Sequence, residues 1–430
     1  MAGAETKAVT RPEQEVPYLA RAQILVPFFV CLYAFPLGVA GQNFILSLVF
    51  LLAMSRLIQW AVNPARKTAS LPPAMVLATG LALAYVLWNA TAGWLNQAAN
   101  PAARPAAFIA GHLGWVFLPV ILGMSGRYLN QRHWQWLAAG TAVLVCAWAM
   151  VALSQSIWGW RIRGISFAPD QLRPRGFYSH PLTLAYASLL VFAPALRALF
   201  RFPGNRSLWF ILAGAMLLVY LTESRMVQGT ALLLLGWNLL TRLRGRSRLL
   251  AVATLLILGI VAGSTENRLS SKFRSMFSEE GFDRQTTAYA DDRLVFWDVH
   301  WDMIKDRPLT GHGPHIRTAY RSTWYEKKGL GEFPKKYEAH NIWLQILTNS
   351  GGIGLALFLC WIFSLLLLIR STYLQPWQRS LFLQTLLAFL FSGFTQNNLQ
   401  DAEVRYGFTL ICSLLFVLCL QQQRSRESQA

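Results

Sequence analysis

Long apolar runs alternate with short polar connections along most of this chain. Runs of roughly 20 apolar residues, the length that crosses a lipid bilayer, recur throughout the 430 residues. We therefore predict an all-α polytopic membrane protein with about 12 transmembrane helices. The predicted spans are 20–38, 43–61, 73–95, 106–124, 134–158, 181–200, 207–222, 226–241, 248–264, 343–370, 379–395 and 404–421.

Two connections are longer and more polar than the others. The first, 159–180, is rich in arginine, and the second, 265–339, holds 13 basic and 12 acidic residues. These loops divide the chain into consecutive parts. We predict nine transmembrane helices in 1–264 with the arginine-rich loop 159–180 among them, a large loop at 265–339, three further helices in 340–421 and a polar tail at 422–430.

The net charge of +19 is not spread evenly over the predicted loops. Lys and Arg gather in one alternate set of short loops, which contain no acidic residue, whereas the Asp and Glu residues between the tails lie on the other side. Enrichment of Lys and Arg marks cytoplasmic loops. We therefore expect both ends in the cytoplasm and the two long loops outside, and we do not expect nucleic acid as a partner.

Targeting and cysteine patterns fit a multi-pass membrane protein. The first twenty residues contain acids and prolines and lack a short apolar core before a cleavage site, so we expect no cleaved signal peptide. All five cysteines fall in predicted spans, which disfavours disulfides and cysteine-based metal sites.

The large loop contains a predicted helix at 292–306. Asp292 can cap its start and Pro308 follows its end, while apolar residues including Trp297 and Trp301 repeat at helical spacing. The tryptophans suit a membrane interface. The next segment, "PLTGHGP", is punctuated by glycine and proline and predicts a tight turn, which we favour over a metal site for His312 and His315.

Several arginines stand where a cation needs a partner. Arg225, in "TESR", interrupts a long apolar region, and a charge there is costly unless it binds an anion or pairs with Glu223. Arg293 begins the 292–306 helix, where it could bind an anion with the helix N-terminus or form a salt bridge to a neighbouring aspartate. Four more arginines on the outside could bind lipid headgroups or the phosphate of a specific substrate. They are Arg161, Arg163, Arg173 and Arg175.

His340 and Asn341 directly precede the apolar run 343–370. A histidine at a helix start is often structural, because its ring can hydrogen-bond a cap or a carbonyl. An imidazole with an ordinary pKa near 6.5 is also the side chain best suited to accept a proton from a hydroxyl at neutral pH. Nucleotide-binding loops, G-x-S-x-G and outside Asp-x-Asp pairs do not occur, which disfavours nucleotide-driven and metal-dependent chemistry.

Taken together, these motifs resemble the O-antigen ligase and polymerase superfamily of bacterial envelope membrane proteins. The matching segments are "RGFYSHP" at 175–181, "TESR" at 222–225, Arg293 with Trp297, "RPLTGHGP" at 307–314, "HNIWLQIL" at 340–347 and "GGIG" at 351–354. Each motif is loose by itself, but their order around one large outside loop is specific.

The resemblance implies a GT-C-like glycosyltransferase of the bacterial inner membrane with a periplasmic active site. It implies transfer of O-antigen from undecaprenyl pyrophosphate to a sugar of lipid A-core, without metal or cofactor and in contact with membrane lipids. It implies catalytic roles for His340, Arg225 and Arg293. Substrate-binding roles are expected at Arg161, Arg163, Arg173, Arg175, Asn341 and Trp297.

Other functions remain open at this point. A polymerase of the same superfamily, or a transferase that passes the glycan to a protein hydroxyl, would share the donor chemistry. The ligase is favoured because the outside arginines suit a phosphorylated acceptor. A transporter of lipid-linked sugar would be expected to show repeats or interrupted spans around a midplane site, and a scaffold would leave Arg225 and His340 unexplained.

Overall fold

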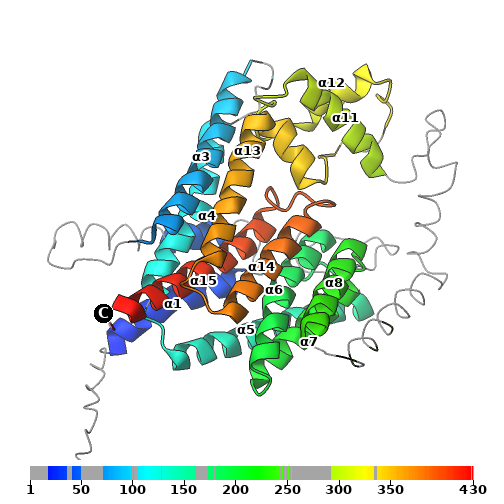
Figure 1. Ribbon diagram of the computed structural model, residues 1–430. Coiled ribbons are helices and arrows are strands. Elements are labelled where there is room, and N and C mark those ends of the chain that lie inside the picture. The colour runs from blue at the N-terminus through cyan, green and yellow to red at the C-terminus, as the bar shows by residue number, and fades with distance from the viewer. Residues whose placement is uncertain are drawn as a thin grey trace, which may run out of the picture.

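The computed structural model describes most of the chain, and its regular structure in these residues is entirely helical (Figure 1). The described residues are 18–35, 41–49, 71–98, 104–126, 128–159, 173–178, 180–242, 292–333 and 337–427, with a few isolated residues between them.

Ten helices correspond to predicted spans. They are α1 (Tyr18–Ala34), α3 (Pro73–Leu95), α4 (Pro105–Gly126), α5 (Gln131–Trp158), α6 (Pro181–Arg201), α7 (Arg206–Leu221), α8 (Arg225–Arg242), α13 (Ile342–Arg370), α14 (Pro376–Ser392) and α15 (Ala402–Glu427). Six of them, α3, α4, α5, α6, α13 and α15, are long and apolar enough to cross a bilayer. The chain is thus consistent with a polytopic membrane protein.

The count of twelve spans and the GT-C-like fold stay predictions. The expected span 248–264 and most of 43–61 lie outside the described residues, although 41–49 is helical. The predicted tail at 422–430 is helical as far as Glu427, where α15 ends.

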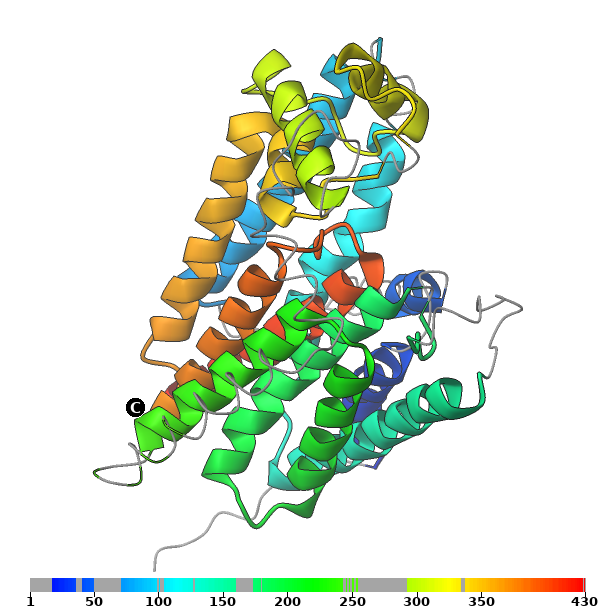
Figure 2. The same cartoon turned by 90° about the vertical axis from the view of Figure 1, so that its right-hand side faces the viewer.

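The spanning helices pack around one continuous apolar core. α15 lies along α4, α13 lies along α3, and α6 packs between α7 and α14 (Figure 2). Large apolar side chains also point outward from these helices, as at Val143, Phe210 and Leu233. Helices that are apolar on their outer faces as well suit a lipid surround.

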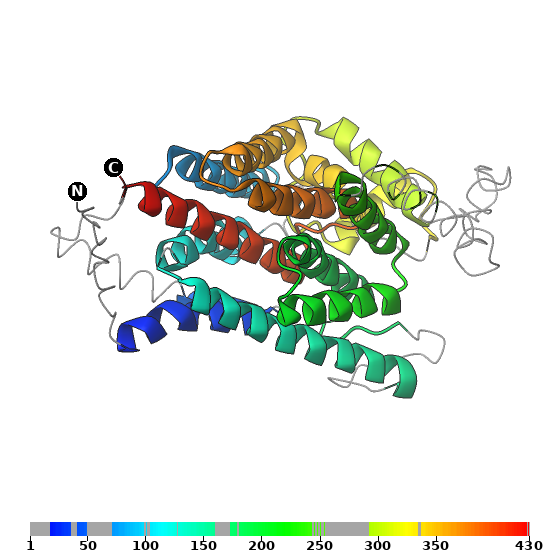
Figure 3. The ribbon, with the colours of Figure 1, turned by 60° about the horizontal axis from the view of Figure 1, so that its bottom comes forward.

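Two shorter helices cover one end of the bundle. α11 (Asp292–Asp306) has the predicted bounds, and α12 (Thr318–Lys327) follows it. Both lie over the start of α13, at the end opposite the first turn of α1 and the last turns of α15 (Figures 1 and 3). Together, α11 and α12 form a cap on the polar end of the molecule.

A small apolar cluster and one lysine hold the cap together. Val295, Phe296 and Tyr325 pack between α11 and α12. Lys328 pairs with the carboxylates of Asp298 and Asp302, at 2.9 Å for Asp302. Partial burial of Asp302 would raise its pKa, but the hydrogen bond and charge of Lys328 outweigh this and lower it.

The helix α13 is kinked at Gly351, which has φ 63° and ψ −165°. The turn at 308–313 fills the kink: Gly352 N donates to Pro308 O at 2.7 Å, and His312 N donates to Thr348 O at 2.8 Å. The two glycine-containing motifs of the sequence therefore form one structural unit. It directs the short first part of α13 toward α11.

Replacing Gly351 with alanine should destabilise this unit. Only glycine adopts this backbone conformation readily, and the added Cβ would meet the Leu309 carbonyl at 2.2 Å. We expect a loss of about 1–3 kcal/mol from the backbone conformation alone, with the clash in addition. The measurement is the thermal unfolding temperature of the detergent-solubilised protein.

Gly352→Ala is the matched control for this change. A Cβ at Gly352 would approach no atom closer than Pro308 O at 3.4 Å. Equal unfolding temperatures for the two variants would contradict the role of the kink.

Candidate active site

His340 lies in a tightly fixed loop between the cap and α13. Its backbone has φ 46°, a left-handed conformation that is uncommon for a residue other than glycine. The indole of Trp297 on α11 donates to Ala339 O at 2.8 Å, and Ala339 N donates to Gln345 Oε1 at 3.0 Å. Contacts from two helices therefore fix the residue directly before the imidazole.

Asn341 fixes the other side of the same loop. Its Oδ1 accepts hydrogen bonds from the backbone N–H groups of Trp343 and Leu344, which caps α13. Its Nδ2 donates to Phe394 O at 3.2 Å. The side chain is buried, so it holds the loop in place beside the α14–α15 connection.

Gln396 determines which nitrogen of His340 carries the proton. The His340 Nδ1 lies 3.1 Å from Gln396 Oε1. An amide oxygen can only accept a hydrogen bond, so Nδ1 is the donor and carries the hydrogen. The neutral ring then has its lone pair on Nε2, where it can accept a proton.

The surroundings keep this imidazole neutral near pH 7. Burial lowers the pKa of His340 below its usual 6.5, the hydrogen bond to Gln396 raises it, and the charge of Arg293 lowers it again. The charge of Glu338 raises the pKa and that of Arg321 lowers it. The balance leaves Nε2 unprotonated and the ring fit to act as a general base.

The α14–α15 connection, residues 393–401, links His340 to α6. The Tyr186 hydroxyl lies 2.9 Å from Thr395 Oγ1, and Thr183 Oγ1 donates to Asp401 Oδ2 at 2.7 Å. From the sequence alone, no role in the site is predicted for this segment. Its polar run "TQNNLQD" between two apolar helices was the available signal.

Arg293 and Arg225 approach the site from different helices. Arg293, in the first turn of α11, is close enough for its charge to act on His340 and on the Tyr186 hydroxyl. The side chain of Ser224, the residue before Arg225 at the start of α8, lies near enough to act on the Tyr186 hydroxyl as well. Tyr186 therefore connects the turn that precedes Arg225 to the surroundings of Arg293.

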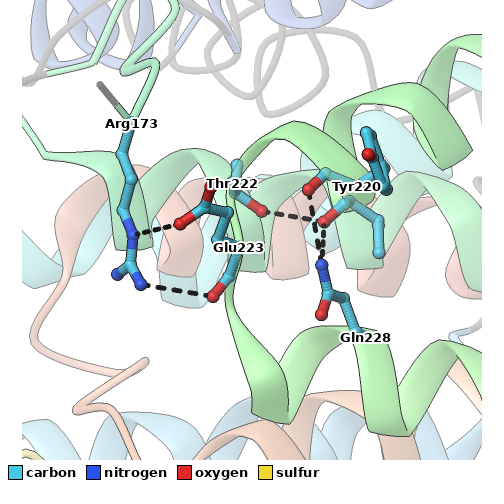
Figure 4. A network of polar contacts seen from close by, with 6 residues as sticks. Arg173, Tyr220, Thr222, Glu223 and Gln228 are labelled. Carbon is cyan, nitrogen blue, oxygen red and sulfur yellow. Dashed lines mark hydrogen bonds and ion pairs between the residues drawn. The ribbon is translucent and has the colours of Figure 1, made fainter. Parts of the chain in front are cut away.

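Glu223 pairs with Arg173, a different arginine from the one considered in the sequence analysis. The Arg173 Nε lies 3.4 Å from Glu223 Oε2, and the guanidinium also donates to the Glu223 carbonyl (Figure 4). Both side chains are about half exposed, so the pair contributes little stability. Glu223 itself has φ 49°, which strains the turn between α7 and α8.

Arg175 lies in a turn that α5 holds firmly. The Gln155 Oε1 accepts from the backbone N–H groups of Arg175 and Gly176, and Gln155 Nε2 donates to Gly176 O. Gly176 has φ 60°, and a Cβ there would come within 2.7 Å of the Trp148 indole nitrogen. The turn is thus fixed at the polar end of α5.

A second imidazole, that of His180, lies near enough to Arg175, Arg173 and His340 for their charges to act on it. Its Nδ1 accepts from Leu182 N at 3.1 Å and caps α6, so the hydrogen of the neutral ring is on Nε2. Partial desolvation lowers the pKa of His180, and Arg175 lowers it further, while Asp401 raises it. His180 is not among the site residues predicted from the sequence, although it lies in the "RGFYSHP" motif.

Of the remaining predicted residues, two arginines lie outside the described part of the chain and the His312 turn lies inside it. Arg161 and Arg163 lie outside the described residues, so their roles stay predictions. His312 forms part of the predicted turn: its Nε2 donates to Met303 O at 2.8 Å, and its Nδ1 accepts from the Tyr320 hydroxyl at 2.9 Å. No group of residues that could hold a metal ion occurs in the described part of the chain.

The region that contains most of these residues also matches a known protein family. A family model described as O-antigen ligase matches residues 208–359, which include α8, the cap, the kink and His340. No curated protein matches the chain. The matched residues make up less than half of the chain, and this region is similar to the O-antigen ligase family.

Gln396 offers a test of the tautomer assignment. Gln396→Glu places a carboxylate at the Nδ1 hydrogen, which stabilises the imidazolium and raises the pKa of His340. The acid limb of the rate, which we expect below pH 6.5 in the unaltered protein, should move to higher pH. Gln396→Leu should lower the rate about tenfold, because the ring loses its fixed orientation.

The measurement is the initial rate of transfer between pH 5 and 8. Gln131→Glu, at an exposed position at the start of α5, is the matched control and should leave the profile unchanged. An identical acid limb in Gln396→Glu and the unaltered protein would exclude the contact as a determinant of the His340 pKa.

Proposed function

We propose that this protein is an O-antigen ligase of the bacterial inner membrane. It transfers the O-antigen polysaccharide from undecaprenyl pyrophosphate to a sugar hydroxyl of lipid A-core on the periplasmic side. The observation that carries the proposal is a neutral imidazole, with its lone pair on Nε2, held beside Arg293 at the polar end of a membrane bundle.

The proposed reaction is a single displacement. The acceptor oxygen forms a bond to the anomeric carbon while the bond from that carbon to the pyrophosphate oxygen breaks with its electron pair. The hydroxyl proton passes to His340 Nε2, and the pyrophosphate leaves as an anion. Attack from the face opposite the leaving group inverts the anomeric configuration.

The arginines act on the leaving group. Pyrophosphate gains negative charge as the glycosidic bond breaks, and fixed guanidinium groups stabilise that charge. Arg293 and Arg225 are proposed to bind the pyrophosphate, since their helices both approach Tyr186. No nucleotide is required, because the donor is already activated, and the arginines take the role that a metal would have.

The other predicted residues are proposed to assist. Arg173 and Arg175 lie on the His180 side and would bind further anionic groups of the substrates or lipid headgroups. Arg161 and Arg163 are proposed for the same task. Trp297 and Asn341 would act by fixing the loop that carries His340, which is the role their hydrogen bonds support.

The orientation in the membrane is part of the proposal. The cap lies at the end opposite the first turn of α1 and the last turns of α15 (Figure 3), and His340 is in the loop between the cap and α13. With Lys and Arg concentrated in the loops on the side of the two termini, that side would be cytoplasmic and the cap periplasmic.

Two related transfer reactions would use the same pyrophosphate-linked glycan donor. A polymerase would join lipid-linked repeat units to each other, and a protein O-oligosaccharyltransferase would use a protein hydroxyl. The arginines of 159–180 favour a phosphorylated acceptor such as lipid A-core. A transporter of lipid-linked sugar would require no base, so His340 with its fixed tautomer argues for a transferase.

His340→Ala should lower the transfer rate by about 10²- to 10⁴-fold, because the general base is lost. Arg225→Lys and Arg293→Lys keep the charge but lose the bidentate hydrogen-bond geometry of the guanidinium. Each should lower the transfer rate about tenfold or more. The assay follows transfer from a lipid-linked glycan to lipid A-core by the purified protein in detergent.

Arg370→Lys, at the exposed end of α13, serves as the matched control. Near-normal turnover of His340→Ala would exclude the general base. Normal activity of both active-site lysine variants would argue against paired guanidinium contacts to the pyrophosphate.

A further inference from the structure

Tyr337 is an exposed aromatic residue directly beside the proposed base. Its side chain is 53% exposed, yet its ring contacts those of Phe296 and His340, with centroids 5.8 Å and 6.1 Å away. Many other exposed aromatic residues lie on spanning helices, where lipid would cover them. Tyr337 instead lies in the loop between the cap and α13 and offers an apolar ring face at the site.

Glu338 follows Tyr337 and is only loosely held. Its Oε1 lies 3.9 Å from Arg321 Nη1, beyond hydrogen-bond distance, and its Oε2 accepts a long bond of 3.4 Å from Asn397 Nδ2. The side chain is 45% exposed. Its oxygens therefore keep capacity to accept hydrogen bonds from a ligand.

Arg321 is a buried cation with unused donors. The residue is 7% exposed, and its Nε and Nη1 have no hydrogen-bond partner within the described part of the chain. One helical turn further along α12, the Tyr325 hydroxyl is likewise buried and lacks such a partner there. Each of these atoms is covered by protein, so Arg321 acts on a ligand through its charge beside Glu338 and not by direct contact.

The charge balance indicates what this ligand is. Arg321 and Glu338 together are neutral, so they attract phosphate less than the Arg173 and Arg175 side does. The exposed Glu338 oxygens accept hydrogen bonds, which a sugar hydroxyl can donate. An exposed aromatic face beside such groups suits a sugar ring, whose C–H face packs on the aromatic ring.

We propose that Tyr337, Glu338 and Arg321 form the subsite for the acceptor sugar. The inference rests on the proposed ligase function and names the residues that select the acceptor. The sugar ring lies on Tyr337, its hydroxyls donate to the Glu338 carboxylate with Arg321 behind it, and the attacking hydroxyl reaches His340 Nε2. The donor pyrophosphate lies toward Arg293 and Arg225, as proposed above.

The test separates acceptor binding from donor binding and from turnover. Tyr337→Ala and Glu338→Gln are made in the full-length protein, and the transfer rate is measured against the concentration of lipid A-core and of lipid-linked O-antigen. We expect KM for lipid A-core to rise about tenfold in each variant, with the donor KM and kcat unchanged. Tyr337→Trp should restore the acceptor KM, because it keeps the aromatic face.

Two matched controls and one further reaction complete the design. Trp301→Ala removes another exposed aromatic side chain from the cap, and Glu332→Gln removes an exposed carboxylate from the loop that follows α12. Both should leave the acceptor KM unchanged. Hydrolysis of the lipid-linked donor by water without lipid A-core is measured for Tyr337→Ala beside the unaltered protein, because it reports on His340 without the acceptor.

Each contrary result has a distinct meaning. A rise in the donor KM alone would assign the sugar face to the donor glycan and overturn the proposal. A fall in kcat and in hydrolysis, with both KM values unchanged, would show that Tyr337 only positions His340. If the unaltered protein transfers no glycan to lipid A-core, the proposed function fails and the acceptor subsite fails with it.

Discussion

The hydrogen bond from His340 Nδ1 to Gln396 Oε1 joins the two parts of the chain on which the site depends. One is the loop that enters α13, and the other is the connection between α14 and α15. The bond places the proton on Nδ1 and leaves Nε2 with its lone pair. The proposed chemistry requires that arrangement, because a ring protonated at Nε2 could not accept the proton of an attacking hydroxyl.

The rest of the fold holds this bond in place. The kink at Gly351, filled by the turn at 308–313, directs the short first part of α13 under the cap. The Trp297 indole and the Asn341 side chain then fix the loop on either side of His340. The left-handed backbone at His340 is maintained because these contacts together outweigh its strain.

The sequence predicted the elements better than it predicted their contacts. The apolar run at 73–95 predicted both the first and the last residue of α3 correctly. Helical spacing between an aspartate cap and a proline predicted both ends of α11 correctly as well. α12 was missed, because its ten residues are mostly polar and show no apolar stripe. Its stability comes from packing against α11, which no local pattern reveals.

The candidate site shows the same difference between residues found from local motifs and contacts that form only in the folded chain. Arg293, Trp297 and His340 were identified from their motifs, and the structure brings them together. Gln396 was not identified, since an amide 56 residues away acquires its role only through folding. The ion-pair partner of Glu223 could not be read from neighbouring residues either. Proximity in sequence suggested Arg225 as a partner, whereas the ion pair is made by Arg173, which lies in a loop distant in sequence.

The most direct test of the proposed function is the envelope of a bacterium from which this protein has been deleted. The account predicts lipopolysaccharide that ends at the core, with polymerised O-antigen accumulating on the prenyl pyrophosphate carrier. His340→Ala supplied in its place should leave that phenotype unchanged. A single O-antigen repeat unit still attached to the core would contradict the account, because it would show that the protein polymerises the glycan and that another protein ligates it.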